Sequence, residues 1–100
     1  MEKQLVQFKF PGMTEKQYDQ VMDELRRTGQ QSPAGRIHHV SSFQNDNCLV
    51  LGVWESREAF DTFNMNVLKP LLSKLGIRQA QPTISSVYYE YSGVEEHASH

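Results

Sequence analysis

The stretch Cys48-Leu-Val-Leu-Gly-Val-Trp-Glu55 decides the fold of this 100-residue chain. In a β-strand successive side chains point to opposite faces, so Leu49 and Leu51 would share one face and Val50 and Trp54 the other. An antiparallel strand that meets water on one side carries polar residues at alternate positions. This strand is apolar on both faces, so its sheet needs a cover on each side.

The sequence around this stretch predicts three more strands and two helices, in the order βαββαβ. Thr14 is the expected N-cap of the first helix, with Gln17 completing a capping box. The second helix is expected to begin after Ser56. Pro70 predicts a break in it near Lys69, because proline lacks an N–H and clashes with the preceding turn. The predicted strands cover residues 4–10, 36–43, 48–55 and 83–91.

A βαββαβ chain places both helices on one face of a four-stranded antiparallel sheet, which is an α+β, ferredoxin-like architecture. The other face is bare, and a second copy of the chain is the simplest cover for it. We therefore expect a homodimer that forms a dimeric α/β barrel, with Tyr88, Tyr89 and Tyr91 in the core and the dimer interface. The alternative is a monomer with a partly wet face, since tyrosine hydroxyls tolerate water. Residues 1–92 form this domain, and residues 93–100 are expected to be a flexible tail.

Composition narrows the class of partner. The net charge of −2 counts against nucleic acid, because no basic surface would hold phosphates. No apolar run approaches the roughly 20 residues that span a bilayer, so we expect no membrane association. Cys48 is the single cysteine, so no internal disulfide can form. Together with an N-terminus that lacks the pattern of a secretion signal, this predicts a cytoplasmic protein.

Three passages resemble a known group of proteins. They are Phe10-Pro-Gly-Met-Thr-Glu-Lys-Gln-Tyr18, Pro33-Ala-Gly-Arg-Ile-His-His-Val40 and Val53-Trp-Glu-Ser-Arg-Glu-Ala-Phe60. The chain is similar to an uncharacterised bacterial branch of the dimeric α/β-barrel superfamily, related to the antibiotic biosynthesis monooxygenases. The resemblance implies this barrel fold, and a substrate site between the sheet and the helices of each subunit. It does not fix the chemistry, because the superfamily includes quinol oxygenases, haem-degrading enzymes, isomerases, cyclases and members without known activity.

The strand pairing brings together the residues best suited to chemistry. A hairpin through Asn45-Asp46 places His39 opposite Gly52 and Ile37 opposite Trp54. His39 and Trp54 then project from one face, and Gly52 leaves room beside them. His39 is the candidate general base, because the imidazole titrates near neutral pH. The candidate ligand-binding residues are Trp54, Gly52, Tyr18, Phe60, Phe63 and Asn64.

A plainer interpretation remains open, in which His39 is a half-buried histidine bonded to the backbone and Trp54 is a core residue. His38 and His39 point to opposite faces of a strand, so they cannot share a metal ion, and no metal site is expected. Haem-degrading relatives use an Asn, Trp and His arrangement. Here Asn64 lies on a different element from Trp54 and His39, so that activity is not carried over.

Two functions follow from these observations. The first is a cofactor-independent, monooxygenase-like enzyme that acts on a small aromatic or apolar molecule in a pocket between sheet and helices. Oxygen chemistry of this kind needs an electron-rich substrate that can be deprotonated, and His39 is the best base available. The second is a non-catalytic homodimer that binds a small ligand or another protein. Haem binding is a third, less favoured hypothesis.

Overall fold

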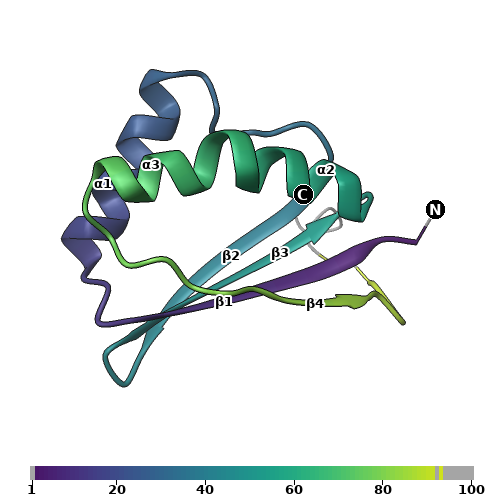
Figure 1. Ribbon diagram of the computed structural model, residues 1–100. Helices are drawn as coiled ribbons and strands as arrows, with labels where there is room; N and C mark the ends of the chain where they lie inside the picture. Colours follow the sequence, from purple (N-terminus) through teal and green to yellow (C-terminus); the bar gives the residue numbers. More distant parts are fainter. Residues whose placement is uncertain (1, 92, 94–100) are drawn as a thin grey trace.

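The computed structural model describes residues 2–91 and 93 and has the expected α+β order. A four-stranded antiparallel sheet, with strand order β2-β3-β1-β4, carries the helices on one face and leaves the other face open (Figure 1). The elements are β1 (Gln4–Pro11), α1 (Glu15–Arg27), β2 (Arg36–Gln44), β3 (Asn47–Trp54), α2 (Arg57–Phe63), η1 (Asn64–Leu68), α3 (Lys69–Lys74) and β4 (Thr83–Ser86). This confirms the predicted ferredoxin-like architecture of the single chain.

The hairpin between β2 and β3 turns through Asn45 and Asp46, both with positive φ, at 50° and 65°. Asn and Asp tolerate this conformation, and a two-residue turn of this kind matches the twist of the strands. The pairing of His39 with Gly52 is confirmed. The predicted pairing of Ile37 with Trp54 is wrong, because the register shifts between Arg36 and His38 and Arg36 takes the place opposite Trp54. Ile37 is the extra residue of a β-bulge.

The caps of the helices are as predicted. The Thr14 hydroxyl accepts from the Gln17 N–H at 3.1 Å, and the Gln17 side chain accepts from the Thr14 N–H at 3.0 Å. Two reciprocal bonds therefore satisfy donors at the start of α1. The Ser56 hydroxyl accepts from the Ala59 N–H at 3.1 Å and does the same for α2.

The predicted helix break near Lys69 is wrong. The chain runs without interruption from α2 through η1 into α3 (Figure 1). In the π-helical turn η1, the Lys69 N–H bonds to the Asn64 carbonyl, and Pro70 then stands in the first turn of α3. A π-turn widens the helix by one residue, which accommodates a proline that a regular α-helix would not.

The core lies between the sheet and the helices. Strands β1 and β3 turn Val6, Phe8 and Trp54 into it, and Phe60 and Leu72 close it from the helices. Cys48 has no exposed surface and packs there as a small apolar residue, as expected. In the described residues no helix is long and apolar enough to cross a membrane.

The predicted last strand is too long, because β4 pairs with β1 only from Thr83 to Ser86. Ser86 lies opposite Gln4, the first residue of β1, so beyond Ser86 no further residue of that strand remains to pair with. The chain instead leaves the sheet, and Glu90 bonds to Lys3 Nζ at 2.6 Å and to His38 Nε2 at 2.8 Å. The tyrosines of this segment are therefore not in the core of the chain. They are Tyr88, Tyr89 and Tyr91, all exposed.

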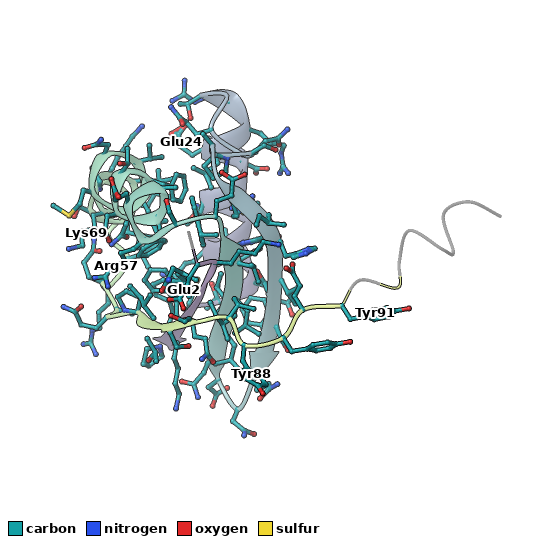
Figure 2. All side chains as sticks on the ribbon, turned by 90° about the vertical axis from the view of Figure 1, so that its right-hand side faces the viewer. Glu2, Glu24, Arg57, Lys69, Tyr88 and Tyr91 are labelled. Carbon is teal, nitrogen blue, oxygen red and sulfur yellow. The ribbon has the colours of Figure 1, made fainter. Side chains whose placement is uncertain are left out.

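Figure 2 shows Tyr88 and Tyr91 projecting from the side of the molecule opposite Arg57 and Lys69 of the helices. The open sheet face carries exposed apolar side chains. Val40 is 57% exposed and Leu51 is 37% exposed, and the two are paired across β2 and β3. The expectation that β3 is apolar on both sides is confirmed. Of the predicted tail, residues 93–100, all but Gly93 lie outside the described residues.

Candidate functional site

A cavity of about 70 Å³ lies between the sheet and the helices. Six of the seven residues predicted to form the site line it, and the face that carries them is the face that the helices cover. These residues are Tyr18, His39, Gly52, Trp54, Phe60 and Phe63. Asn64 is buried at the junction of α2 and η1, but it does not line this cavity.

Trp54 forms the aromatic wall and is only 3% exposed. Its ring centroid lies 5.5 Å from that of Phe60 and 5.6 Å from that of Phe63. A Cβ added at Gly52 would meet Trp54 Nε1 at 3.0 Å. The indole therefore lies over the glycine and occupies much of the space that its missing side chain leaves.

The polar end of the cavity joins α1 to β2. Tyr18 Oη lies 3.2 Å from His39 Nε2 and 2.5 Å from Ser41 Oγ. Ser41 Oγ is also 3.4 Å from His39 Nε2. With a neutral imidazole protonated at Nδ1, the Tyr18 hydroxyl can donate to Nε2 while the Ser41 hydroxyl donates to Tyr18.

Arg36 is brought to the same wall by the bulge at Ile37, which places side chains 36 and 39 on one face. One guanidinium nitrogen donates to the Gln31 carbonyl at 2.6 Å. Burial lowers the pKa of His39 below its usual 6.5, and the charge of Arg36 lowers it further. The imidazole is therefore neutral at pH 7 and able to accept a proton.

His38 points to the opposite side of the sheet, where it bonds to Glu90. The expectation that the two neighbouring histidines face apart is confirmed. Among residues 2–91 and 93, no group of three or more His, Cys, Asp or Glu side chains is placed to hold a metal ion.

Comparison with protein-family models and with curated proteins finds no match for the sequence. Solved structures do match. Rv0793 from Mycobacterium tuberculosis is similar at a TM-score of 0.68 and 14% identity, over 90% of this chain and 99% of that one. SnoaB, a cofactor-independent oxygenase from Streptomyces nogalater, matches at 0.63 and 12% identity, over 89% and 95% of the two chains. A candidate antibiotic biosynthesis monooxygenase from Deinococcus radiodurans matches at 0.64 and 11% identity, over 89% and 96%.

The chain shares the ferredoxin-like α+β fold of these proteins. A dimeric ferredoxin-like protein from an uncultured marine organism has it as well, with a TM-score of 0.62 and 17% identity over 92% of this chain and 93% of that one. At these identities the likeness is one of fold, so the chemistry of this chain must be argued from its own residues.

Two residues at the polar end of the cavity, Ser41 and Arg36, are absent from the predicted site. Ser41 is two residues after His39 in the same strand, so the alternation of side chains is enough to predict that both point to the cavity. Arg36 is two residues before His38, so in a regular strand it would share the open face with His38. Only the bulge at Ile37 brings it to the cavity, and nothing in the local sequence marks that bulge.

Proposed function

We propose that this protein is a cofactor-independent, monooxygenase-like enzyme that acts on a small aromatic or apolar molecule in the cavity between sheet and helices. The observation that carries the proposal is a neutral histidine, His39, at the one polar end of an otherwise apolar cavity. The fold shared with SnoaB, itself a cofactor-independent oxygenase, supports the reaction class.

In this proposal His39 Nε2 takes a proton from an acidic C–H or O–H of the substrate. The electron-rich anion passes one electron to O₂, and the resulting radical pair combines to form a C–O bond. The O–O bond of the peroxide then breaks, one oxygen stays as a carbonyl and the other leaves as water. A CH₂ group and O₂ thus become C=O and H₂O, so the substrate itself supplies the reducing electrons.

The residues that line the cavity have distinct parts in this scheme. Tyr18 positions the imidazole through its hydrogen bond to Nε2 and must release that nitrogen when the proton is taken. Trp54 and Phe63 exclude water and provide flat surfaces for an aromatic substrate. Arg36 places a positive charge near the anion that forms.

The test compares His39→Ala with His38→Ala, a matched control that removes the neighbouring imidazole from the opposite face. Oxygen uptake is measured with a panel of small hydroquinones and enolisable phenols. Loss of a general base should lower turnover by about 10²–10⁴-fold in His39→Ala and leave His38→Ala unchanged. Unchanged turnover in His39→Ala would refute the assigned base.

The working form in this proposal is a homodimer in which the open sheet faces of two copies meet. Val40 and Leu51 supply an exposed apolar surface there, and the exposed tyrosines beyond β4 would lengthen the contact. The ferredoxin-like protein of similar fold that is described as dimeric supports a dimeric state. A monomeric mass in light scattering at micromolar concentration would contradict it.

The second candidate function is a non-catalytic homodimer that binds a small ligand. The close contact of the Trp54 indole with Gly52 favours this second function. The indole leaves little free volume in which a substrate could be repositioned during a reaction. Binding to the native state raises the melting temperature, so a ligand that stabilises the protein but is never consumed identifies this function.

A further inference from the structure

Arg36 is a half-buried cation that has no acidic partner in the part of the chain that the structure describes. Its hydrogen bond goes to a neutral backbone carbonyl, that of Gln31. The ion pairs found among the described residues involve other side chains. A charge withdrawn from water is costly unless a counter-charge or hydrogen bonds compensate it.

The charged side chains that line the cavity with Arg36 are of positive sign only. Of its 17 lining residues, three are titratable: Tyr18, Arg36 and His39. Arg36 is always charged, and His39 is neutral at pH 7 for the reasons given above. No carboxylate is among these lining residues, so the electrostatic potential inside the cavity favours an anion.

The cavity also limits the size of its occupant. Its volume of about 70 Å³ is smaller than the roughly 150 Å³ of an engineered cavity that holds benzene. A single ring therefore already requires side chains to move, and we take one ring as the upper size for an occupant. The apolar walls would pack against the ring, and the polar end would bind one oxygen-containing group of the ligand.

We propose that the cavity selects a one-ring molecule with an acidic oxygen, such as a phenol or an arenecarboxylic acid, and binds it as its oxyanion with Arg36 as counter-ion. This rests on the proposed function, and it adds a substrate class and a specificity-determining residue. The ligand loses its O–H proton to His39 Nε2 or to water, and the oxyanion accepts from the guanidinium of Arg36 and the hydroxyl of Tyr18.

The test uses 4-nitrophenol, which ionises near neutral pH and whose anion is yellow. The chain has one tryptophan, Trp54, which lines the cavity, so quenching of its fluorescence reports occupancy. Binding to the wild type should shift bound 4-nitrophenol toward its anion. Arg36→Gln should weaken nitrophenolate binding by about tenfold or more, the loss of one charge-assisted bond. Arg36→Lys should retain part of the affinity.

Two controls separate charge from packing. Arg57→Gln removes an exposed arginine that pairs with Asp61 and does not line the cavity. Toluene is a neutral one-ring probe whose binding should be the same in all variants. Benzoate and benzamide, which have similar shapes and different charges, are compared on the wild type, so the inference stays testable even if Arg36→Gln does not fold.

The outcomes distinguish this inference from the proposed function. If toluene binds but benzoate is no better than benzamide, the cavity is a ligand site without anion selectivity and the inference alone fails. The same holds if Arg36→Gln and Arg57→Gln bind nitrophenolate equally. If none of these probes quenches Trp54, the ligand cavity and the proposed function both fail.

Discussion

Tyr18 of α1 and His39 of β2 meet across the cavity, with 3.2 Å between the phenolic oxygen and Nε2. This contact ties the first helix to an edge strand of the sheet. Tyr18→Phe removes it and also removes the bond to Ser41. We expect a loss of about 0.5–1.5 kcal/mol per hydrogen bond in urea unfolding. In a double-mutant cycle with Ser41→Ala, the two changes should not be additive.

His39 should make stability depend on pH in a narrow window. Its folded pKa lies below the unfolded value of 6.5, so the folded chain binds the proton less readily than the unfolded chain. The stability is complete above pH 6.5 and falls as the pH drops through the folded pKa. Urea unfolding across this range should show the fall in the wild type and in His38→Gln, but less of it in His39→Gln. The pKa of Glu24, lowered to about 2 by its bonds to Arg27 and Lys74, affects only more acidic solutions.

Trp54→Ala should be among the most destabilising single changes. The indole is 3% exposed and packs against Phe60 and Phe63, so truncation leaves a large cavity in the core. We expect a loss of about 3–5 kcal/mol in the free energy of unfolding. Met65→Ala, at an exposed residue of η1 outside the proposed dimer contact, is the control and should change stability by less than about 0.5 kcal/mol. Equal effects would show that the indole does not pack in the core.

Gly52→Ala tests the close approach of backbone and indole. The new methyl would lie 3.0 Å from Trp54 Nε1, so the ring must move. We expect overpacking to cost about 1–3 kcal/mol and the fluorescence spectrum of Trp54 to shift. An unchanged spectrum together with unchanged stability would mean that the indole lies elsewhere.

Leu51→Glu should separate the proposed dimer into monomers, because it places a charge in the middle of the open sheet face. Light scattering should give a dimer mass for the wild type and a monomer mass for this variant. Met65→Glu, at an exposed apolar residue of η1, is the matched control and should leave the mass unchanged. A Leu51→Glu protein that stays dimeric would place the interface elsewhere.

The parts of the fold that the sequence could predict are those fixed by local chemistry. The reciprocal bonds of Thr14 and Gln17, the turn at Asn45 and Asp46, and the alternation in β3 all depend on near neighbours in the chain. They also suffice to place His39 and Trp54 on one face of the sheet, and the structure shows that the helices cover that face.

The parts that it could not predict depend on distant partners. The end of β4 at Ser86 is set by where β1 begins, at Gln4. Pro70 is tolerated because a π-turn precedes it, and hydrophobic spacing does not reveal that turn. Arg36 reaches the cavity only through a shift in pairing between two strands.

The bulge at Ile37 divides β2 into two segments of opposite phase. Side chains before it and after it can be assigned to the two faces independently, although they belong to one strand. Deleting residue 37 would remove the bulge, leave Arg36 opposite Trp54 and on the face of His39, and keep the hairpin from His38 onward in register. The bulge thus absorbs one extra residue without displacing the arginine from the cavity wall, so the side chain at position 37 can vary while the lining of the cavity stays the same.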